Sequence, residues 1–330
     1  DLLAHLVAAG MVVVAEAPED GGAPMFAEDT DPALMSWRPL DLMFHVATSI
    51  GRHDKDIGMT YRLEQGAPVE PVVMPPHRVG AVDLYRPRLP DLLATDPPFT
   101  AVLEANRPAN GFGPEPPTVR DVAELLYRTA RVRSLSEESR AGHPRVMVSD
   151  RPYLTSGSCH PFEIYLAVHA CEGLARGVYH YDPLAHRLET VPSGDADVAE
   201  LIESGRVGAG LAEGPPVLLV ITARLRRLSW KYNGLSYVLV LRDLGHFVQT
   251  TLLASTAMGL AAATVTATDI ALGARVLGTD WRTEPSVAGI AIGASAPGGE
   301  KTISMRSAND AEWADQSVSL LAEKRIKRHT

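Results

Sequence analysis

The stretch that decides the fold is LSWKYNGLSYVLVLRDLGHFVQTTLLASTAMGLAAATVTATD, which runs from Leu228 to Asp269. Its middle predicts a long helix, because apolar residues recur there at helical spacing. These residues are Leu241, Leu244, Val248, Leu252 and Met258. Asp243, His246 and Gln249 fall off this apolar face. Many small residues surround it and let other backbones come close, so we expect the helix to be buried along much of its circumference.

A basic amine and a phenol stand next to each other just before this helix, at Lys231 and Tyr232. Burial lowers the pKa of a lysine, and a nearby ammonium group favours a phenolate. Either side chain can then remove a proton from a substrate as a general base. From the residues alone, the simpler interpretation is an exposed lysine beside a core tyrosine, and both interpretations stay open.

The composition narrows the class of protein. The chain has 330 residues and a formal net charge of −9, which argues against nucleic acid and anionic membranes as partners. Its two cysteines, Cys159 and Cys171, are too few for a disulfide framework and are typical of reduced thiols in a cytoplasmic protein. We expect no signal peptide. The weakly charged run 247–272 contains Gln249, Gly259 and many hydroxyls, so we expect a buried helix rather than a membrane span.

The order of predicted elements indicates an α+β fold with an antiparallel sheet between helices. Thr118 and Asp121 resemble a capping box that opens a helix, and a helix capped by Asp195 is expected through Ile202. Strands are expected at 162–168, 216–222 and 289–294, with a hairpin around Asp182 and Pro183. A proline-rich passage at 68–98 predicts a boundary between a domain at 1–95 and a second domain at 96–330.

Several segments, in one order and spacing, resemble the SagB-type dehydrogenases, a group with the nitroreductase-like fold. They include RPYLTSGSCHPFEIY (151–165), GVYHYDPLAHRLE (177–189), WKY (230–232), GHFVQTTLLASTAMGLA (245–261) and EPSVAGIAIG (284–293). The resemblance implies FMN bound at a homodimer interface. It also implies oxidation of thiazoline or oxazoline rings in a ribosomally made peptide to thiazoles or oxazoles. The flavin would supply the hydride acceptor and the protein the positioning.

The resemblance also implies roles for individual residues. Lys231 and Tyr232 correspond to the paired catalytic residues. The run Ser156, Gly157 and Ser158 resembles the loop whose backbone approaches the flavin ring, where a glycine permits unusual dihedrals. Gln249 matches a glutamine on the family's long helix, as either a packing residue or a polar contact.

The expected phosphate site departs from the family pattern. Relatives carry Arg-Arg-Ser-x-Arg after Leu-Glu, which gives a phosphate several charged donors. Here the run 103–110 reads LEANRPAN, in which Arg107 is the one cation and Asn106 and Asn110 are further donors.

Two further cofactor positions follow from the same resemblance. Thr266 and Ala267 stand where relatives carry glycines, so their side chains would crowd or contact the cofactor. Arg306, or else Lys301, is expected to supply a replacement charge for the phosphate after the last strand.

Three functions follow from these observations. The first is an FMN-dependent azoline dehydrogenase, with a modified precursor peptide as substrate, a homodimeric state and a cyclodehydratase partner. The second is an NAD(P)H-dependent flavin reductase of small molecules. The third is a flavin-free scaffold that binds a peptide or partner enzyme. We expect no metal, because His160, His180 and His186 match no zinc spacing.

Overall fold

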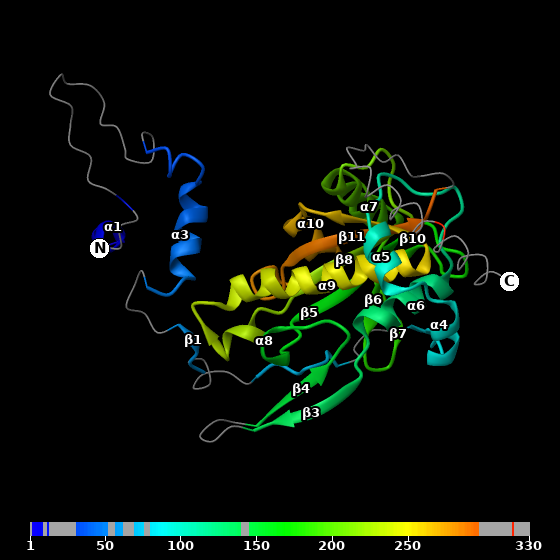
Figure 1. Cartoon of the computed structure of the whole chain (residues 1–330), viewed down its shortest axis with the longest axis horizontal. Helices are drawn as coiled ribbons and strands as arrows, with labels where there is room; N and C mark the ends of the chain where they lie inside the picture. Colours follow the sequence, from blue (N-terminus) through cyan, green and yellow to red (C-terminus); the bar gives the residue numbers. More distant parts are fainter. Residues whose placement is uncertain are drawn as a thin grey trace. The chain divides into compact units, whose positions relative to one another are not determined.

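The computed structural model describes residues 2–8, 12, 31–51, 57–61, 69–75, 80–139, 145–296 and 319. The chain divides into two compact units (Figure 1). The smaller unit comprises Asp1–Ala67 and Ser229–Val238, and the larger unit comprises Pro68–Leu228 and Leu239–Thr330. A boundary near residue 95 stays a prediction.

A seven-stranded sheet forms the centre of the larger unit, in the order β10-β11-β8-β5-β6-β7-β2. Every neighbouring pair in this order is antiparallel. The strands are β2 (Ala81–Asp83), β5 (Phe162–Val168), β6 (Gly177–Asp182), β7 (Arg187–Val191), β8 (Val217–Ala223), β10 (Leu260–Val265) and β11 (Ser286–Ala294).

Two helices cover one face of this sheet. Helices α7 (Asp195–Ala209) and α10 (Ile270–Leu277) share one apolar cluster with alternate residues of β5 and β8, such as Tyr165 and Leu218. Successive side chains of a strand point to opposite faces, so Phe162, Ile164 and Leu166 of β5 face the other way. All seven residues of β5 are buried, so both of its faces are covered.

The long helix α9 (Ser236–Met258) lies along the opposite face through its larger-unit part (Figure 1). The rings of Phe247 and Phe162 are 6.4 Å apart between centroids. Helix α6 (Val119–Ala130) adjoins the β6–β7 hairpin, because Val132 N–H donates to the carbonyl of Pro183 at 2.8 Å. The remaining elements here are α4 (Leu89–Thr95), α5 (Phe99–Ala105), α8 (Arg226–Ser229), the hairpin β3 (Ser134–Glu138) with β4 (Val146–Asp150), and the short 3-10 helix η1 (Ser156–Ser158).

The smaller unit holds α1 (Leu2–Ala8), α3 (Pro39–Ala47) and a short antiparallel pair, β1 (Gly58–Met59) with β9 (Tyr232–Asn233). Met59 pairs with Tyr232 in this ladder. No helix of the described residues has the length and apolarity required to cross a bilayer.

The expected α+β fold is confirmed, including the capping box at Thr118 and Asp121 and the hairpin of β6 and β7. One helix start was wrong. Asp195 is the first residue of α7 rather than its cap; Gly194 takes the cap position, and Asp197 accepts a hydrogen bond from the Gly194 N–H. The helix also continues to Ala209 because its buried face follows the sheet beyond Ile202.

The buried face of α9 agrees only in part with the predicted one, because Leu244 and Met258 are buried as expected but a further stripe is buried beside them. The structure buries Leu239, Asp243, Phe247, Thr251 and Ser255, which lie four residues apart on one stripe. Leu241 of the predicted face is exposed, whereas Asp243, which was placed off that face, is buried. A count of apolar residues cannot find this stripe, because three of its five members are polar.

Candidate functional site

The loop that carries Ser156, Gly157 and Ser158 has an unusual backbone. Gly157 (φ 57°, ψ 31°) and Ser158 (φ 50°) are both left-handed, and so is His160 (φ 42°). A left-handed conformation is common for glycine but costs free energy for other residues, so the surrounding structure has to hold it. Gly157 and Ser158 are exposed, and the Gly157 N–H takes no part in the hydrogen bonds that close the turn.

A buried carboxylate fixes this loop. Ser156 donates its backbone N–H to Asp243 Oδ2 and its hydroxyl to Asp243 Oδ1, both at 2.9 Å. Asp243 belongs to α9 and is 1% exposed. Burial raises the pKa of Asp243, and the two hydrogen bonds from Ser156 oppose that rise because they favour the carboxylate. The loop position is therefore set by the long helix.

An aromatic cluster lies next to the loop. The ring of Tyr153 is 5.0 Å from that of His160 and 4.9 Å from that of Phe247. Burial, and then the charges of Arg151 and Arg227, lower the pKa of His160 to about 3. His160 is therefore neutral at physiological pH and acts as a packing residue.

Buried arginines hold the same region from another side. Arg227 donates Nε and Nη2 to the carbonyl of Cys159 at 3.1 and 2.9 Å, and Nη1 to the carbonyl of Glu70 at 2.7 Å. Arg224 donates to the carbonyl of Pro71, and Arg151 to that of Val72. Three guanidinium groups thus bind three consecutive carbonyls of one extended segment, and Arg227 links that segment to the 155–160 loop.

Lys231 and Tyr232 belong to the smaller unit. Lys231 is 3% exposed, and its Nζ lies 6.0 Å from the centroid of the Tyr232 ring. The Lys231 carbonyl accepts the Tyr61 N–H at 3.3 Å, and Tyr232 is half-buried in β9. The simpler of the two sequence interpretations, in which Lys231 is exposed beside a core tyrosine, is therefore wrong. Their catalytic role stays a prediction.

The expected phosphate donors lie just after α5. Arg107 and Asn110 are both exposed, and Arg107 Nη1 donates to the carbonyl of Asn106 at 2.8 Å. Asn106 Oδ1 accepts the Thr256 hydroxyl at 3.1 Å, which ties this segment to α9. A guanidinium and an amide that face solvent have the donor chemistry for a phosphate, so these residues fit an FMN phosphate.

Helix α9 joins these two regions. Asp243 holds the 155–160 loop and Thr256 holds the segment at Asn106. These anchors are 13 residues apart, which is about 20 Å along a helix with a rise of 1.5 Å per residue. Gln249 lies between them in the sequence and is exposed.

Thr266 and Ala267 follow β10 and lie against α7. Thr266 donates both its N–H and its hydroxyl to the carbonyl of Gly208, each at 3.1 Å. A Cβ on Gly208 would meet the carbonyl oxygen of Ala267 at 2.4 Å, so a glycine is required there. Both predicted residues are exposed. Arg306 and Lys301 lie outside the described residues.

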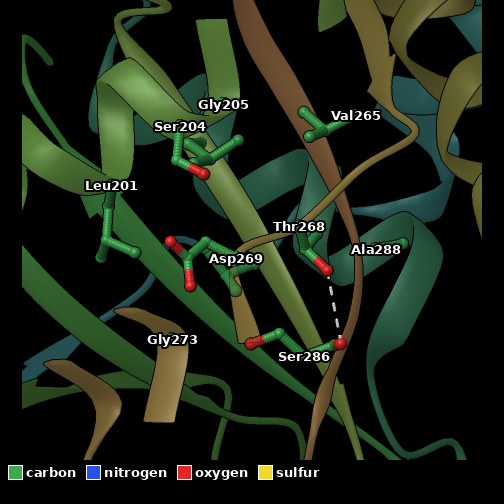
Figure 2. Close-up of a pocket in the computed structure, with 11 residues that line it drawn as sticks. Leu201, Ser204, Gly205, Val265, Thr268, Asp269, Gly273, Ser286 and Ala288 are labelled. Atoms are coloured by element: carbon green, nitrogen blue, oxygen red, sulfur yellow. Dashed lines mark hydrogen bonds between the residues drawn. The ribbon is translucent and has the colours of Figure 1, made fainter. Parts of the chain in front are cut away.

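A small cavity adjoins this turn between α7, α10 and the sheet. Figure 2 shows Asp269, Thr268 and Ser286 around it, with the Thr268 hydroxyl donating to the Ser286 carbonyl at 3.4 Å. Its volume of about 20 Å³ has room for about one water molecule. The cavity is therefore far too small for a flavin.

The described residues contain no group of three or more His, Cys, Asp or Glu side chains arranged to hold a metal. Two of the histidines considered for a metal have other partners. His180 Nε2 lies 2.9 Å from Glu163 Oε2, and His186 Nδ1 lies 2.8 Å from the Tyr181 hydroxyl.

Sequence reasoning missed Asp243 and Arg227, which both bind the loop. The available signal for Asp243 was its spacing, because it lies four residues after Leu239 and four residues before Phe247. The sequence gives no signal for Arg227. Its neighbour Arg226 is also an arginine, and only the structure shows that Arg227 is buried whereas Arg226 is exposed.

Comparison with known proteins gives a consistent result. A family model described as the nitroreductase family matches residues 111–294. The trifolitoxin-processing protein TfxB of Rhizobium leguminosarum bv. trifolii is 28% identical over 173 residues, which are 49% of this chain and 45% of TfxB. The chain therefore spans less than half of the length of this curated relative.

Two solved structures share the fold. One, from Ralstonia eutropha JMP134 and described as a nitroreductase, superposes with a TM-score of 0.50 at 21% identity, over 70% of this chain and all of that chain. Another, from Anabaena variabilis, has a TM-score of 0.53 at 16% identity, over 79% of this chain and 47% of that chain. The expected nitroreductase-like fold is confirmed.

Proposed function

The chain belongs to the nitroreductase family, and we propose that it is an FMN-dependent dehydrogenase that oxidises azoline rings. Its substrate is a thiazoline or oxazoline in a ribosomally made peptide, and its product is the aromatic thiazole or oxazole. Members of the family are generally flavin-dependent oxidoreductases, which supports the redox part of this proposal.

The observation that carries the peptide part is the similarity to TfxB, a protein named for the processing of trifolitoxin. Two structural features support the flavin part. The left-handed loop at Gly157 and Ser158 presents backbone to solvent from a fixed position, and Arg107 and Asn110 present phosphate donors. These residues, with Ser156, are our candidates for cofactor binding; Gln249, Thr266, Ala267 and Arg306 are further candidates.

The reaction removes two hydrogens from the ring, one as hydride and one as a proton. FMN, when bound, supplies the hydride acceptor. In our proposal Lys231 or Tyr232 takes the proton from ring carbon, either as a neutral amine or as a phenolate.

The test is incubation of the FMN-loaded protein with a cyclised peptide and analysis by mass spectrometry. Each ring oxidised should lower the peptide mass by about 2 Da, the mass of the two hydrogens that the flavin and base receive. Lys231→Ala and Tyr232→Phe should each abolish the loss. Tyr237→Phe, an exposed tyrosine of the smaller unit, is the matched control and should retain it.

Two results would contradict different parts of the proposal. Full activity in both Lys231→Ala and Tyr232→Phe would remove the catalytic assignment but leave the dehydrogenase. A colourless preparation that does not bind added FMN would instead favour the flavin-free scaffold.

We further propose a homodimer and a cyclodehydratase partner in the cytoplasm, with residues 1–95 as the part that binds the peptide or the partner. Light scattering of the purified protein measures the oligomeric state. Peptide affinity of a variant without residues 1–67 tests the binding role and leaves strand β2 in its sheet. Unchanged affinity would place peptide recognition elsewhere.

A further inference from the structure

A polar pocket lies where the turn between β6 and β7 meets the end of α6. Its volume is about 270 Å³. Arg86, Arg131 and Arg133 line it, together with Tyr127, Leu184 and His186. None of these residues belongs to the loop at 155–160 or to the segment at Arg107. Three guanidinium groups in one pocket stand out in a chain with a net charge of −9.

The three arginines are held in place by hydrogen bonds to backbone carbonyls. Arg86 Nη2 donates to the carbonyl of Ala185. Arg131 Nη1 donates to the carbonyl of Tyr127 at 2.6 Å, and its guanidinium lies 4.4 Å from the centroid of the Tyr127 ring. Arg133 Nη2 donates to the carbonyl of Arg151 at 2.7 Å. Each group therefore keeps other N–H donors for a ligand, in a fixed orientation.

Within the described part of the chain, carboxylates balance the charge of this pocket only in part. Arg133 forms an ion pair with Asp150 at 2.6 Å. Among the described residues, neither Arg86 nor Arg131 has a carboxylate within ion-pair distance. The pocket thus has two positive charges that no described carboxylate compensates, and two such charges match one dianion.

His186 also lines the pocket and lies within the electrostatic field of its arginines. It is 2% exposed; its Nδ1 faces the Tyr181 hydroxyl, its Nε2 faces the Tyr85 carbonyl at 2.9 Å, and its ring packs edge-on against Tyr127. Burial lowers the pKa of His186, the Tyr85 carbonyl opposes this, and the charges of Arg86 and Arg131 lower the pKa further. The left-handed backbone of His186 (φ 54°) keeps the ring in this position.

We infer that this pocket binds a phosphate group in its dianionic form. A guanidinium presents paired N–H donors that match phosphate oxygens, and three of them surround the space for one such group. The pocket is separate from the donors proposed for the FMN phosphate, so this inference goes beyond the proposed function. The phosphate source is either the free ion or a phosphate monoester on a peptide.

The experiment follows the His186 ring signals by NMR in FMN-loaded protein, while inorganic phosphate is added at constant ionic strength. We expect a saturable shift and a rise in the pKa of His186, because the bound anion cancels the field of Arg86 and Arg131. Arg86→Gln and Arg131→Gln should each weaken the apparent affinity by about tenfold or more, the loss of one charged contact. Arg145→Gln removes the same charge from an exposed site outside the pocket and should bind as the wild type does.

Two outcomes would overturn the inference. One is a shift of the His186 signals that never saturates, and the other is equal affinity in Arg86→Gln and Arg145→Gln. Arg86 is exposed, so its variant remains informative even if Arg131→Gln fails to fold. Tighter binding of a phosphoserine peptide than of inorganic phosphate would assign the monoester as the ligand, and equal binding would assign the free ion.

Discussion

Ser156 and Asp243 are 87 residues apart in sequence and are joined by two hydrogen bonds of 2.9 Å. A serine on the proposed flavin loop thereby uses both of its donors on one buried carboxylate of the long helix. Hydrogen bonds to a charged acceptor are stronger than neutral ones, and the acceptor Asp243 is buried here. The left-handed loop backbone is consequently a property of the loop and helix together.

Asp243→Asn should release this loop. The carbonyl oxygen of the asparagine can accept one of the two hydrogen bonds from Ser156. The NH₂ group would then face the other Ser156 donor, so that the second hydrogen bond is lost. We expect a loss of about 1.5–3 kcal/mol in the free energy of unfolding, the range for hydrogen bonds to a charged group. Weaker retention of FMN should accompany it. Denaturant unfolding and the absorbance of bound flavin measure the two effects.

The matched control is Arg242→Gln, which changes the exposed neighbour of Asp243 on α9. It should leave both quantities near the wild-type values. Equal stability and flavin content in Asp243→Asn would show that the loop keeps its shape without this carboxylate.

Arg227→Lys should destabilise the larger unit, although the charge is kept. A lysine cannot reproduce the fork that binds the carbonyls of Cys159 and Glu70. Burial lowers the pKa of the Arg227 guanidinium to about 10, so the group is still charged at neutral pH. We expect a loss of about 2–4 kcal/mol, because a buried carbonyl is left without its donor. Arg226→Lys is the control at the exposed neighbour, and an equal effect of both changes would rule out the carbonyl contacts as the cause.

His160 should contribute to the change of the free energy of unfolding with pH. Its pKa is about 3 in the folded protein against 6.5 for an ordinary histidine. Between these values the unfolded chain binds a proton that the folded protein does not bind. The free energy of unfolding therefore rises with pH up to about 6.5 and decreases as the pH is lowered from there. The slope from this one group is about 1.4 kcal/mol per pH unit where the unfolded histidine is fully charged.

His160→Gln should remove this contribution to the slope. Denaturant unfolding between about pH 4 and 6, below the ordinary histidine pKa, measures it. Tyr153→Phe changes a neighbouring ring that does not titrate in this range and should keep the slope of the wild type. A slope unchanged by His160→Gln would mean that the folded protein protonates this histidine as readily as the unfolded chain does.

Arg107→Gln should weaken the binding of FMN, because Arg107 is the one cation in the run 103–110. We expect a rise in the dissociation constant of about tenfold, which corresponds to the loss of one charge-assisted contact. Quenching of flavin fluorescence measures this constant without any substrate. Arg145→Gln is again the control of equal charge, and identical constants would show that the phosphate lies elsewhere.

Much of the fold could be predicted because it depends on local patterns. The largely apolar run in β8, the capping box at Thr118 and the turn at Asp182–Pro183 each specify an element from a few neighbouring residues. The candidate loop at 156–158 was predictable as a segment through its resemblance to a family. Its left-handed backbone was not, because a serine such as Ser158 rarely adopts that conformation unless tertiary contacts hold it.

The sequence by itself determined which segments become strands and helices, because hydrophobic periodicity and capping residues act over a few positions. Only the tertiary structure decided that Asp243 is buried, that Arg227 binds the loop whereas Arg226 faces solvent, and that Arg86, Arg131 and Arg133 meet in one pocket. A charged side chain is stable inside a protein only beside partners that satisfy it. Those partners come from distant parts of the chain, and folding alone brings them together.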